Sequence, residues 1–123
     1  MRTIHKARTR RARRQRRHVR LRQKVSGSAA RPRLVVFRSL KHVYAQLVDD
    51  AAGRVLCGVS DRAKGFTPEG TGKVGRSTAV GKLLADKAKA MGITTVVFDR
   101  AGFPYHGRVK AVAEGARAGG LEF

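Results

Sequence analysis

Residues 98–108 read FDRAGFPYHGR, and they gather side chains that support two different kinds of chemistry. Asp99, Tyr105 and His106 are residue types that enzymes use to transfer protons. The same stretch holds residues of the types that bind phosphates and stack on unpaired bases, namely Arg100, Phe103, Tyr105 and Arg108. The segment therefore predicts either an active-site loop or a nucleic-acid contact, and the other residues of the chain favour one of the two.

Those other residues give an active site little support. Metal-assisted hydrolysis needs a cluster of carboxylates, yet the first apolar run, residues 33–39, contains no acidic residue. Four scattered histidines and one cysteine lack the spacing of a metal site, and Cys57 lies within a predicted strand, where a small core residue is expected. Asp99 is as well explained as the residue that ties down its own turn, and His106 as the start of a helix. We therefore expect no enzyme, no metal and no cofactor.

Two glycine-rich stretches resemble nucleotide-binding motifs but lack their context. Residues 70–75, GTGKVG, match the dinucleotide pattern, yet a loop with Pro68 precedes them and the nearest acid, Asp86, falls inside a predicted helix. Residues 75–83, GRSTAVGKL, have Leu83 where a phosphate-binding loop needs Ser or Thr. Neither stretch predicts a small-molecule substrate.

The charge of the chain points to a polyanionic partner. The 123 residues include 28 Lys and Arg against 8 Asp and Glu, which gives a net charge of +20. One small domain with this surplus repels itself when alone, and nucleic acid is the partner that the surplus favours. An anionic membrane surface is the weaker interpretation, because the arginine-rich stretch lacks large apolar residues and no apolar run approaches the roughly 18 residues of a membrane span. With no secretory signal pattern and a single cysteine, we expect a cytoplasmic protein.

Half of the basic residues lie in an N-terminal arm. Fourteen of the 28 fall within residues 1–33, where no acidic residue occurs. We divide the chain into this arm with its linker, residues 1–30, and a domain, residues 31–123. The arm has too few apolar residues to offset its ordering entropy, which predicts a segment that is disordered or transiently helical until it lies along a polyphosphate. Its candidate RNA-binding residues are Arg8, Arg10, Arg11, Arg13, Arg14, Arg16, Arg17, Arg20 and Arg22.

An organelle transit peptide is a second interpretation of the arm, because such peptides are also rich in arginine and poor in acidic residues. Repeated arginine pairs and the absence of serine from the first 25 residues argue against it. A tail that serves only solubility is a third interpretation.

The domain shows the patterns of three strands followed by a helix, a strand and a helix. The first three runs are β-branched or alternating and are joined by short turns, which predicts an antiparallel meander. A helix that starts at Ser77 or Thr78 and ends at Gly92 follows, with Leu84 and Met91 among its apolar residues. The predicted strands are residues 33–39, 42–50, 54–61 and 93–99, and the predicted second helix is residues 106–118. The order βββαβα defines an α/β fold in which the fourth strand can lie parallel to the first.

Two segments of the domain are distinctive: FDRAGFPYHGRVKAVAEGARAGGLEF, residues 98–123, and RPRLVVFRSLKHVYAQLVDD, residues 31–50. They resemble the bacterial ribosomal protein L-eighteen family, which binds 5S rRNA. The first segment is similar to the end of that family's sequence, and the second is similar to its first two strands. The arm is similar in character only, and residues 62–75 depart from the family pattern, so we assign no shared contact to them.

The resemblance implies both a fold and a function. The fold is a mixed sheet of order 3-2-1-4 with two helices packed on it, in which only the second strand is antiparallel to the others. Its topology is related to that of ribonuclease H, without the catalytic carboxylates. The function is that of a non-enzymatic constituent of the large ribosomal subunit that docks 5S rRNA onto the large-subunit rRNA at the central protuberance, beside neighbouring ribosomal proteins.

The first hairpin turn, the adjoining strand face and the loop after the fourth strand are the expected RNA contacts of the domain. Their candidate residues are Arg38, Ser39, Lys41, His42, Tyr44, Gln46, Arg100, Phe103, Tyr105, His106, Gly107 and Arg108. A plain exposed strand face is the alternative for Tyr44 and Gln46, and a core position is the alternative for Phe103. The alternative function is a non-specific basic nucleic-acid binder whose arm supplies all of the affinity.

Overall fold

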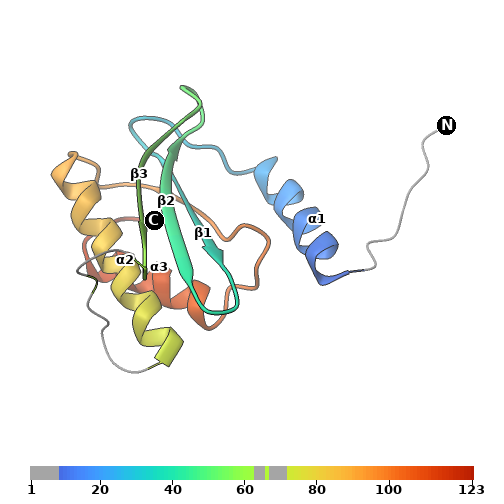
Figure 1. Cartoon of the computed structure of the whole chain (residues 1–123). Helices are drawn as coiled ribbons and strands as arrows, with labels where there is room; N and C mark the ends of the chain where they lie inside the picture. Colours follow the sequence, from blue (N-terminus) through green and yellow to red (C-terminus); the bar gives the residue numbers. More distant parts are fainter. Residues whose placement is uncertain (1–8, 63–65, 67–71) are drawn as a thin grey trace.

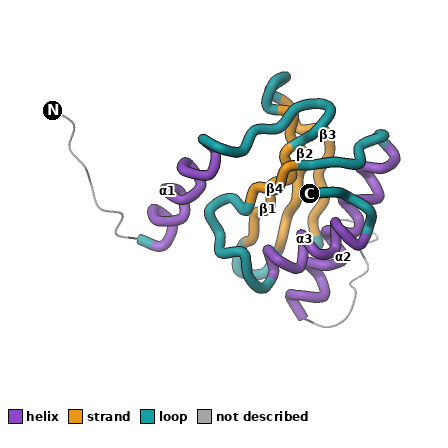
Figure 2. The backbone as a smooth tube through the Cα atoms, turned by 180° about the vertical axis from the view of Figure 1, so that it is seen from behind, coloured by secondary structure: helices purple, strands orange, loops and turns teal. Residues whose placement is uncertain are grey.

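The fold is a four-stranded sheet with two helices packed on one face and a third helix that stands apart from them (Figure 1). The structure is a computed structural model and describes residues 9–62, 66 and 72–123. Its elements are α1 (Arg10–Arg22), β1 (Arg33–Arg38), β2 (Val43–Asp49), β3 (Arg54–Ser60), α2 (Gly72–Ala90), β4 (Val97–Asp99) and α3 (Arg108–Ala118). Seen from behind, α2 and α3 lie side by side against the sheet (Figure 2).

The sheet has the predicted order and strand directions. The strands follow one another as β3-β2-β1-β4, with β2 antiparallel to both of its neighbours and β4 parallel to β1. In the β1–β2 pair, Leu34 lies opposite Leu47 and Val36 opposite Ala45. Because alternate residues of a strand point to the same face, these four side chains form one apolar face, and all four are fully buried beneath the helices.

Strand β4 is shorter than the predicted strand 93–99. Ile93 and Val96 are buried, as their apolar character suggests. However, the backbone before β4 is hydrogen-bonded to the C-terminal segment instead of β1: the Val96 amide donates to the Glu122 carbonyl at 3.1 Å, and the Glu122 amide donates to the Thr94 carbonyl at 2.9 Å. The apolar pattern was therefore a correct guide to burial, while the hydrogen-bond partner came from a remote segment.

Helix α2 begins earlier than predicted, at Gly72, inside the stretch expected to be a loop. Ser77 and Thr78 are not caps: the Ser77 hydroxyl donates to the Lys73 carbonyl at 2.8 Å, and the Thr78 hydroxyl donates to the Val74 carbonyl at 3.1 Å. Bonds of this kind to the preceding turn are typical of hydroxyl residues inside a helix. Most of the rest of the predicted loop lies outside the described residues.

The end of α2 and the limits of α3 follow the sequence pattern closely. Gly92 has a φ of +79°, the left-handed conformation that favours glycine just after a helix. Met91, which the apolar pattern placed in the core, follows the last residue of α2 and is 49% exposed. Helix α3 starts at Arg108 instead of 106, since Gly107 at a φ of +58° precedes it as the N-cap.

Helices α2 and α3 cross with their backbones in direct contact. A Cβ atom placed on Gly81 would lie 2.1 Å from the Val112 carbonyl oxygen, and one on Gly115 would lie 2.2 Å from the Thr78 carbonyl oxygen. Both distances are far shorter than any real contact of a methyl group. The glycines therefore allow the close crossing, which brings both helices onto one small sheet.

The arm differs from the sequence analysis, because residues 10–22 form a helix in the structure where a disordered or transiently helical segment was predicted. The Thr9 hydroxyl accepts a hydrogen bond from the Ala12 amide at 3.0 Å and so caps the helix. Arginine and glutamine are good helix formers, and Arg20 and Arg22 lie in the last turn, where positive charge is favourable. No residue of α1 is buried, so hydrophobic burial does not hold the helix in place, and the contacts that do are polar.

We expect Gly115→Ala to destabilise the protein, although alanine is the better helix former by about 1 kcal/mol. The new methyl group would overlap a backbone carbonyl of α2, and we expect a net loss of about 1–3 kcal/mol in the free energy of unfolding, measured by urea denaturation. Glu114→Ala, at the exposed neighbouring position, is the control and should change stability by less than about 0.5 kcal/mol. A gain in stability for Gly115→Ala would contradict the close crossing.

Candidate nucleic-acid interface

The buried carboxylate of Asp99, at the end of β4, fixes α1 against the domain. Asp99 is 1% exposed. One of its oxygens lies 3.0 Å from Nε2 of His18 on α1 and 2.6 Å from Nη1 of Arg33 on β1, and the other accepts the Ala101 amide at 2.8 Å. Burial acts to raise the pKa of Asp99, but the hydrogen bonds from Ala101, His18 and Arg33 outweigh it and the pKa is lowered. The prediction that Asp99 ties down its own turn is confirmed, and the carboxylate does more than that.

Asp50, just after β2, is a second anchor for the end of α1. The Arg33 side chain donates to the Asp50 carboxylate at 3.0 Å, the Gly27 amide at 2.7 Å and the Arg22 guanidinium at 3.3 Å. The hydrogen bond from Arg33 is the main reason why the pKa of Asp50 is lowered. Arg33 therefore bridges the two acids. Burial acts to lower the pKa of Arg33, and its bonds to Asp50 and Asp99 raise it overall.

The backbone of α1 touches the loop after β4 at Gly102. This residue has a φ of +80°, and a Cβ atom on it would lie 2.2 Å from the Arg14 carbonyl oxygen. The Arg17 side chain donates from Nε to the Gly102 carbonyl at 2.8 Å. The Arg14 guanidinium lies over the ring of Phe103, 4.6 Å from its centroid. Glycine is thus required here both for its backbone conformation and for the approach of the helix.

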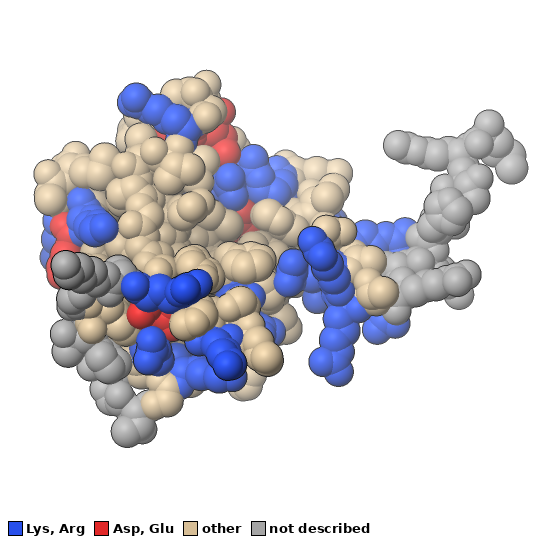
Figure 3. Space-filling view, viewed as in Figure 1, with Lys and Arg blue, Asp and Glu red and all other residues tan. Residues whose placement is uncertain are grey.

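A cleft between α1, the β1–β2 turn and the loop before α3 is lined mainly by guanidinium groups. It has a volume of about 830 Å³, and we call it the arginine hollow. Its lining residues are Arg10, Arg11, Arg13, Arg14, Arg17, Phe37, Arg38, Ser39, Leu40, Phe103, Pro104 and Arg108. Seven of these twelve are arginines and none is acidic, so the hollow is a strongly positive site. The space-filling view shows Lys and Arg along α1 and at the lower edge of the domain (Figure 3).

Two arginines of the hollow are brought close together by the fold. The Arg108 guanidinium donates to the Ser39 carbonyl at 2.8 Å, which holds it beside the hairpin turn. Arg38 lies over the ring of Phe103, 4.8 Å from the centroid. Burial, followed by the charge of Arg108, lowers the pKa of Arg38. Like charges held together without an acid between them favour the binding of an anion.

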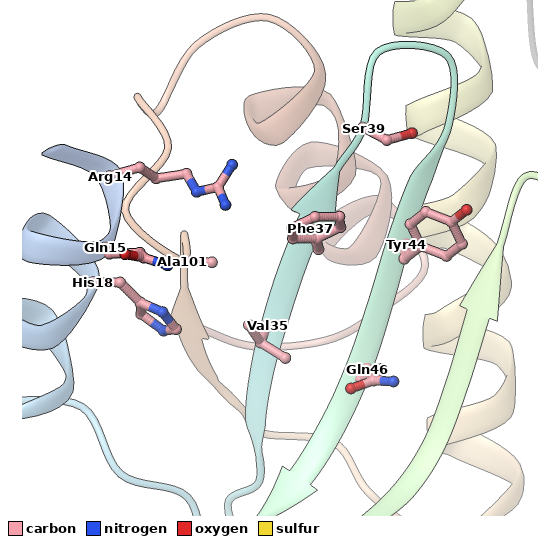
Figure 4. Close-up of a pocket in the computed structure, with 9 residues that line it drawn as sticks. All are labelled: Arg14, Gln15, His18, Val35, Phe37, Ser39, Tyr44, Gln46 and Ala101. Atoms are coloured by element: carbon pink, nitrogen blue, oxygen red, sulfur yellow. The ribbon is translucent and has the colours of Figure 1, made fainter. Parts of the chain in front are cut away.

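A second cleft separates α1 from the face of the sheet that carries no helix. Its volume is about 730 Å³, and we call it the sheet hollow. Its lining residues are Arg14, Gln15, His18, Val35, Phe37, Ser39, Tyr44, Gln46 and Ala101 (Figure 4). In the close-up, α1 presents its polar side chains from one side and the two strands present their rings and Gln46 from the other.

The structure brings many of the predicted RNA-binding residues together. Those in the arginine hollow are Arg10, Arg11, Arg13, Arg14, Arg17, Arg38, Ser39, Phe103 and Arg108. Tyr44 and Gln46 line the sheet hollow. Arg16, Arg20, Lys41 and His106 are exposed but line neither hollow. Arg8 lies outside the described residues.

The remaining predicted residues have partners within the protein. His42 Nδ1 lies 3.1 Å from the buried Asp61 carboxylate, and Arg100 donates to the Phe103 carbonyl at 2.7 Å. The Tyr105 hydroxyl accepts from Arg117 at 3.3 Å, although the residue is 42% exposed. Arg22 binds Asp50 and Gly107 caps α3, as described above.

Phe103 occupies the core position that the sequence left open as an alternative. It is only 4% exposed. Its ring packs edge-on against Phe37 at 5.8 Å and carries the Arg14 and Arg38 guanidinium groups. The ring therefore supports the arginines of the hollow, and its RNA contact stays a prediction.

Five residues of the sheet hollow were not singled out by sequence: Gln15, His18, Val35, Phe37 and Ala101. Phe37 lies directly opposite Tyr44 in the β1–β2 register, so the alternation of the two strands could have predicted that both side chains lie on the same face of the sheet. Gln15 and His18 lie one turn apart on α1, and only the assumption of a helical arm would have placed them together. Ala101, with a φ of +55°, gives no sequence signal.

The described residues contain no other kind of candidate site. Among them, no three His, Cys, Asp or Glu side chains gather closely enough to hold a metal ion. Burial raises the pKa of the Cys57 thiol, which makes it a poor nucleophile at neutral pH. None of the helices in the described ranges has the length and apolar character needed to cross a membrane.

Comparison with known proteins identifies relatives over most of the chain. The family described as "Ribosomal L18 of archaea, bacteria, mitoch. and chloroplast" matches residues 8–123. The large ribosomal subunit protein uL18 of Desulforudis audaxviator is 55% identical over 118 residues, which are 94% of this chain and 96% of that protein. The uL18 protein of an Exiguobacterium species is 56% identical over 110 residues, 89% of this chain and 92% of its own. That of Solibacter usitatus is 55% identical over 106 residues, 86% of this chain and 88% of its own.

We expect Asp99→Asn to release α1 from the domain, because the amide carries no charge to balance Arg33. Breaking a buried ion pair from one side costs about 3–5 kcal/mol, and we expect a loss of that order in the free energy of unfolding. Faster hydrogen exchange of the α1 amides would accompany it. Asp86→Asn, at an exposed site on α2, is the matched control, and unchanged exchange of α1 in Asp99→Asn would contradict this anchoring role.

Acidification should lower the free energy of unfolding, because Asp50 and Asp99 become protonated. The pKa values of Asp50 and Asp99 are lowered in the folded state, so the unfolded state binds more protons when the pH falls. Their contribution to stability is therefore complete above the ordinary carboxyl pKa of about 3.9 and is lost as the pH falls from there through the lowered values. Urea denaturation at a series of pH values should show this loss, and Asp99→Asn should show a shallower one. Equal acid dependence in Asp99→Asn and the native chain would count against the assignment.

Proposed function

The chain belongs to the uL18 family of ribosomal proteins, and from this premise we propose that it binds 5S rRNA and helps attach it to the large-subunit rRNA at the central protuberance. As a member of this family it is a structural constituent of the large ribosomal subunit and not an enzyme. Cytoplasmic ribosomes and contact with neighbouring large-subunit proteins are part of the same proposal.

The observation that carries the proposal is the arginine hollow. Seven guanidinium groups from α1, β1 and the start of α3 line one cleft without an acidic residue. Guanidinium groups bind phosphate oxygens in pairs of parallel hydrogen bonds, and neutralised phosphates release their counterions. An RNA backbone that runs between α1 and the domain would supply the anions that this cleft lacks.

The fold also explains why the arm and the domain would bind RNA together. Arg10 and Arg11 belong to the arm, while Arg38 and Arg108 belong to the domain, and all four line the same cleft. The contacts of Asp99 and Asp50 with residues of α1 hold the arm in a fixed position against the domain. Contacts to one RNA segment would therefore come from both, which a loose basic tail does not achieve.

A non-specific basic binder is the competing function, and the exposed arginines of α1 favour it. Such a protein would bind any polyanion at low salt, so affinity alone does not separate the two functions. The ratio of affinities for specific and non-specific RNA at physiological salt does separate them.

We expect the full chain to bind 5S rRNA at least about tenfold more tightly than tRNA at roughly 0.15 M salt. Arg38→Gln/Arg108→Gln, in the domain side of the hollow, should reduce the affinity for 5S rRNA. The same variant should lower the slope of log affinity against log salt by about one for each phosphate that the protein no longer neutralises. Fluorescence anisotropy at several salt concentrations measures both quantities.

Arg54→Gln/Arg62→Gln removes the same charge from exposed arginines outside both hollows and is the matched control. It should leave the ratio of the two affinities unchanged. If the control and the hollow variant weaken binding to 5S rRNA and tRNA equally, or if the native chain shows no preference, the non-specific function takes the place of the proposed one.

A further inference from the structure

We propose that the sheet hollow is a binding site for an unpaired nucleobase of the RNA whose phosphates lie in the arginine hollow. This inference rests on the proposed function and adds to it the part of the protein that reads a base. Four observations support it: the continuity of the two hollows, the rings in the sheet hollow, its unengaged amides and its charge.

The two hollows are continuous. Arg14, Phe37 and Ser39 line both of them. The Arg14 guanidinium lies over both neighbouring rings, 4.6 Å from the centroid of Phe103 and 5.5 Å from that of Phe37. Arg14 thus stands at the boundary, where it can bind the phosphate next to an inserted base. An RNA strand in the arginine hollow would therefore reach the sheet hollow by turning out a nucleotide beside Arg14.

The sheet hollow offers the aromatic faces that an unstacked base requires. Phe37 and Tyr44 lie opposite each other on β1 and β2, with ring centroids 6.2 Å apart and planes inclined by 44°. Phe37 is 46% exposed, although large apolar residues favour burial. Val35 and Ala101 add apolar surface between the rings and α1 (Figure 4). A base that stacks on one of these rings would exclude water from this surface.

Two side-chain amides face the same space and are unengaged. Gln15 extends from α1 and Gln46 from β2, and within the described part of the chain neither amide makes a hydrogen bond. Each amide carries a donor and an acceptor. This is the pattern that complements the edge of a base, and single-stranded RNA is read mostly through such edges. The same atoms would have no counterpart on an apolar ligand.

The charge of the sheet hollow disfavours a cationic occupant at its centre. Its lining includes one arginine, at the boundary, and no acidic residue. His18 is already held by Asp99 at 3.0 Å. A neutral, flat and polar-edged group matches these walls, and a nucleobase has all three properties. The volume of about 730 Å³ falls in the range of roughly 300–1,000 Å³ that is usual for small-molecule and cofactor sites.

The test is chemical probing of every unpaired base of 5S rRNA with base-specific reagents, in the free RNA and in the saturated complex with the full chain. We expect the native chain to protect at least one unpaired base. Gln15→Ala/Gln46→Ala should restore the reactivity of that base and weaken binding by roughly tenfold, as expected for the loss of two hydrogen bonds to its edge. The salt dependence of binding should stay unchanged, since no phosphate contact is removed.

Two variants serve as controls. Gln23→Ala removes an exposed glutamine that lies at the end of α1 and outside both hollows, and it should preserve both protection and affinity. Arg10→Gln/Arg11→Gln should lower the affinity and the salt slope but leave the base protected at saturation. Thermal unfolding of each variant shows that the fold is intact.

The outcomes separate this inference from the function on which it rests. If the native chain prefers 5S rRNA but Gln15→Ala/Gln46→Ala leaves every protection and the affinity unchanged, the base site is refuted and the proposed function stands. The hollow would then be open to another occupant, such as a side chain of a neighbouring protein. If the native chain shows neither preference nor protection, both are refuted together.

Discussion

The arrangement of arm and domain depends on the buried carboxylate of Asp99. A chain with a net charge of +20 has a strong electrostatic reason to keep an arginine-rich helix away from the rest of itself. Asp99 reverses this repulsion locally, because it binds Arg33 and His18 while it accepts the amide of its own turn. Removing a carboxylate from water is costly, and an ion pair offsets that cost only when its hydrogen bonds are complete. Here three donors surround the carboxylate, and its pKa is lowered in spite of its burial.

Arg33 links this carboxylate to a second acid that binds the last residue of α1. Its guanidinium also binds Asp50, which in turn binds the Arg22 side chain and the Gly27 amide. The C-terminal half of the helix is therefore held by the contacts of His18 with Asp99 and of Arg22 with Asp50, and no residue of the helix is buried. Helices held by apolar contact lie close against a sheet, whereas this one is held by long side chains and leaves space beneath it. That space is the sheet hollow, and the polar contacts that hold the arm leave it open.

The strands, the two helices of the domain and the local turns of the fold could be predicted from the sequence, but the contacts between residues far apart in the chain could not. The alternation of apolar residues was enough to predict strands β1 and β2, and the order of the strands in the sheet followed from a family resemblance. The role of Asp99 in its own turn could be predicted because its partner, Ala101, is two residues away. The other partners of Asp99 are 66 and 81 residues distant, and nothing in Arg33 or His18 marks them out among so many basic residues. The early start of α2 was missed because its first turns contain glycines and hydroxyl residues, which usually indicate a loop. Many residues of the candidate site could be predicted from the sequence. Their division between two hollows could not, because it depends on the position of α1 against the domain.

Fixing α1 has a consequence for how such a protein would discriminate between RNAs. Phosphate contacts orient a protein on its RNA and carry no sequence information, which comes from contacts with bases. An arm of arginines in solution would supply only the first kind of contact. Docked against the sheet, the arm places Arg14 beside Phe37, Tyr44 and Gln46, and Arg14 lines both hollows. In the proposed complex, discrimination would therefore belong to the docked state and affinity to the charge alone, so a chain whose arm is released should keep much of its binding at low salt while it loses its preference between RNAs.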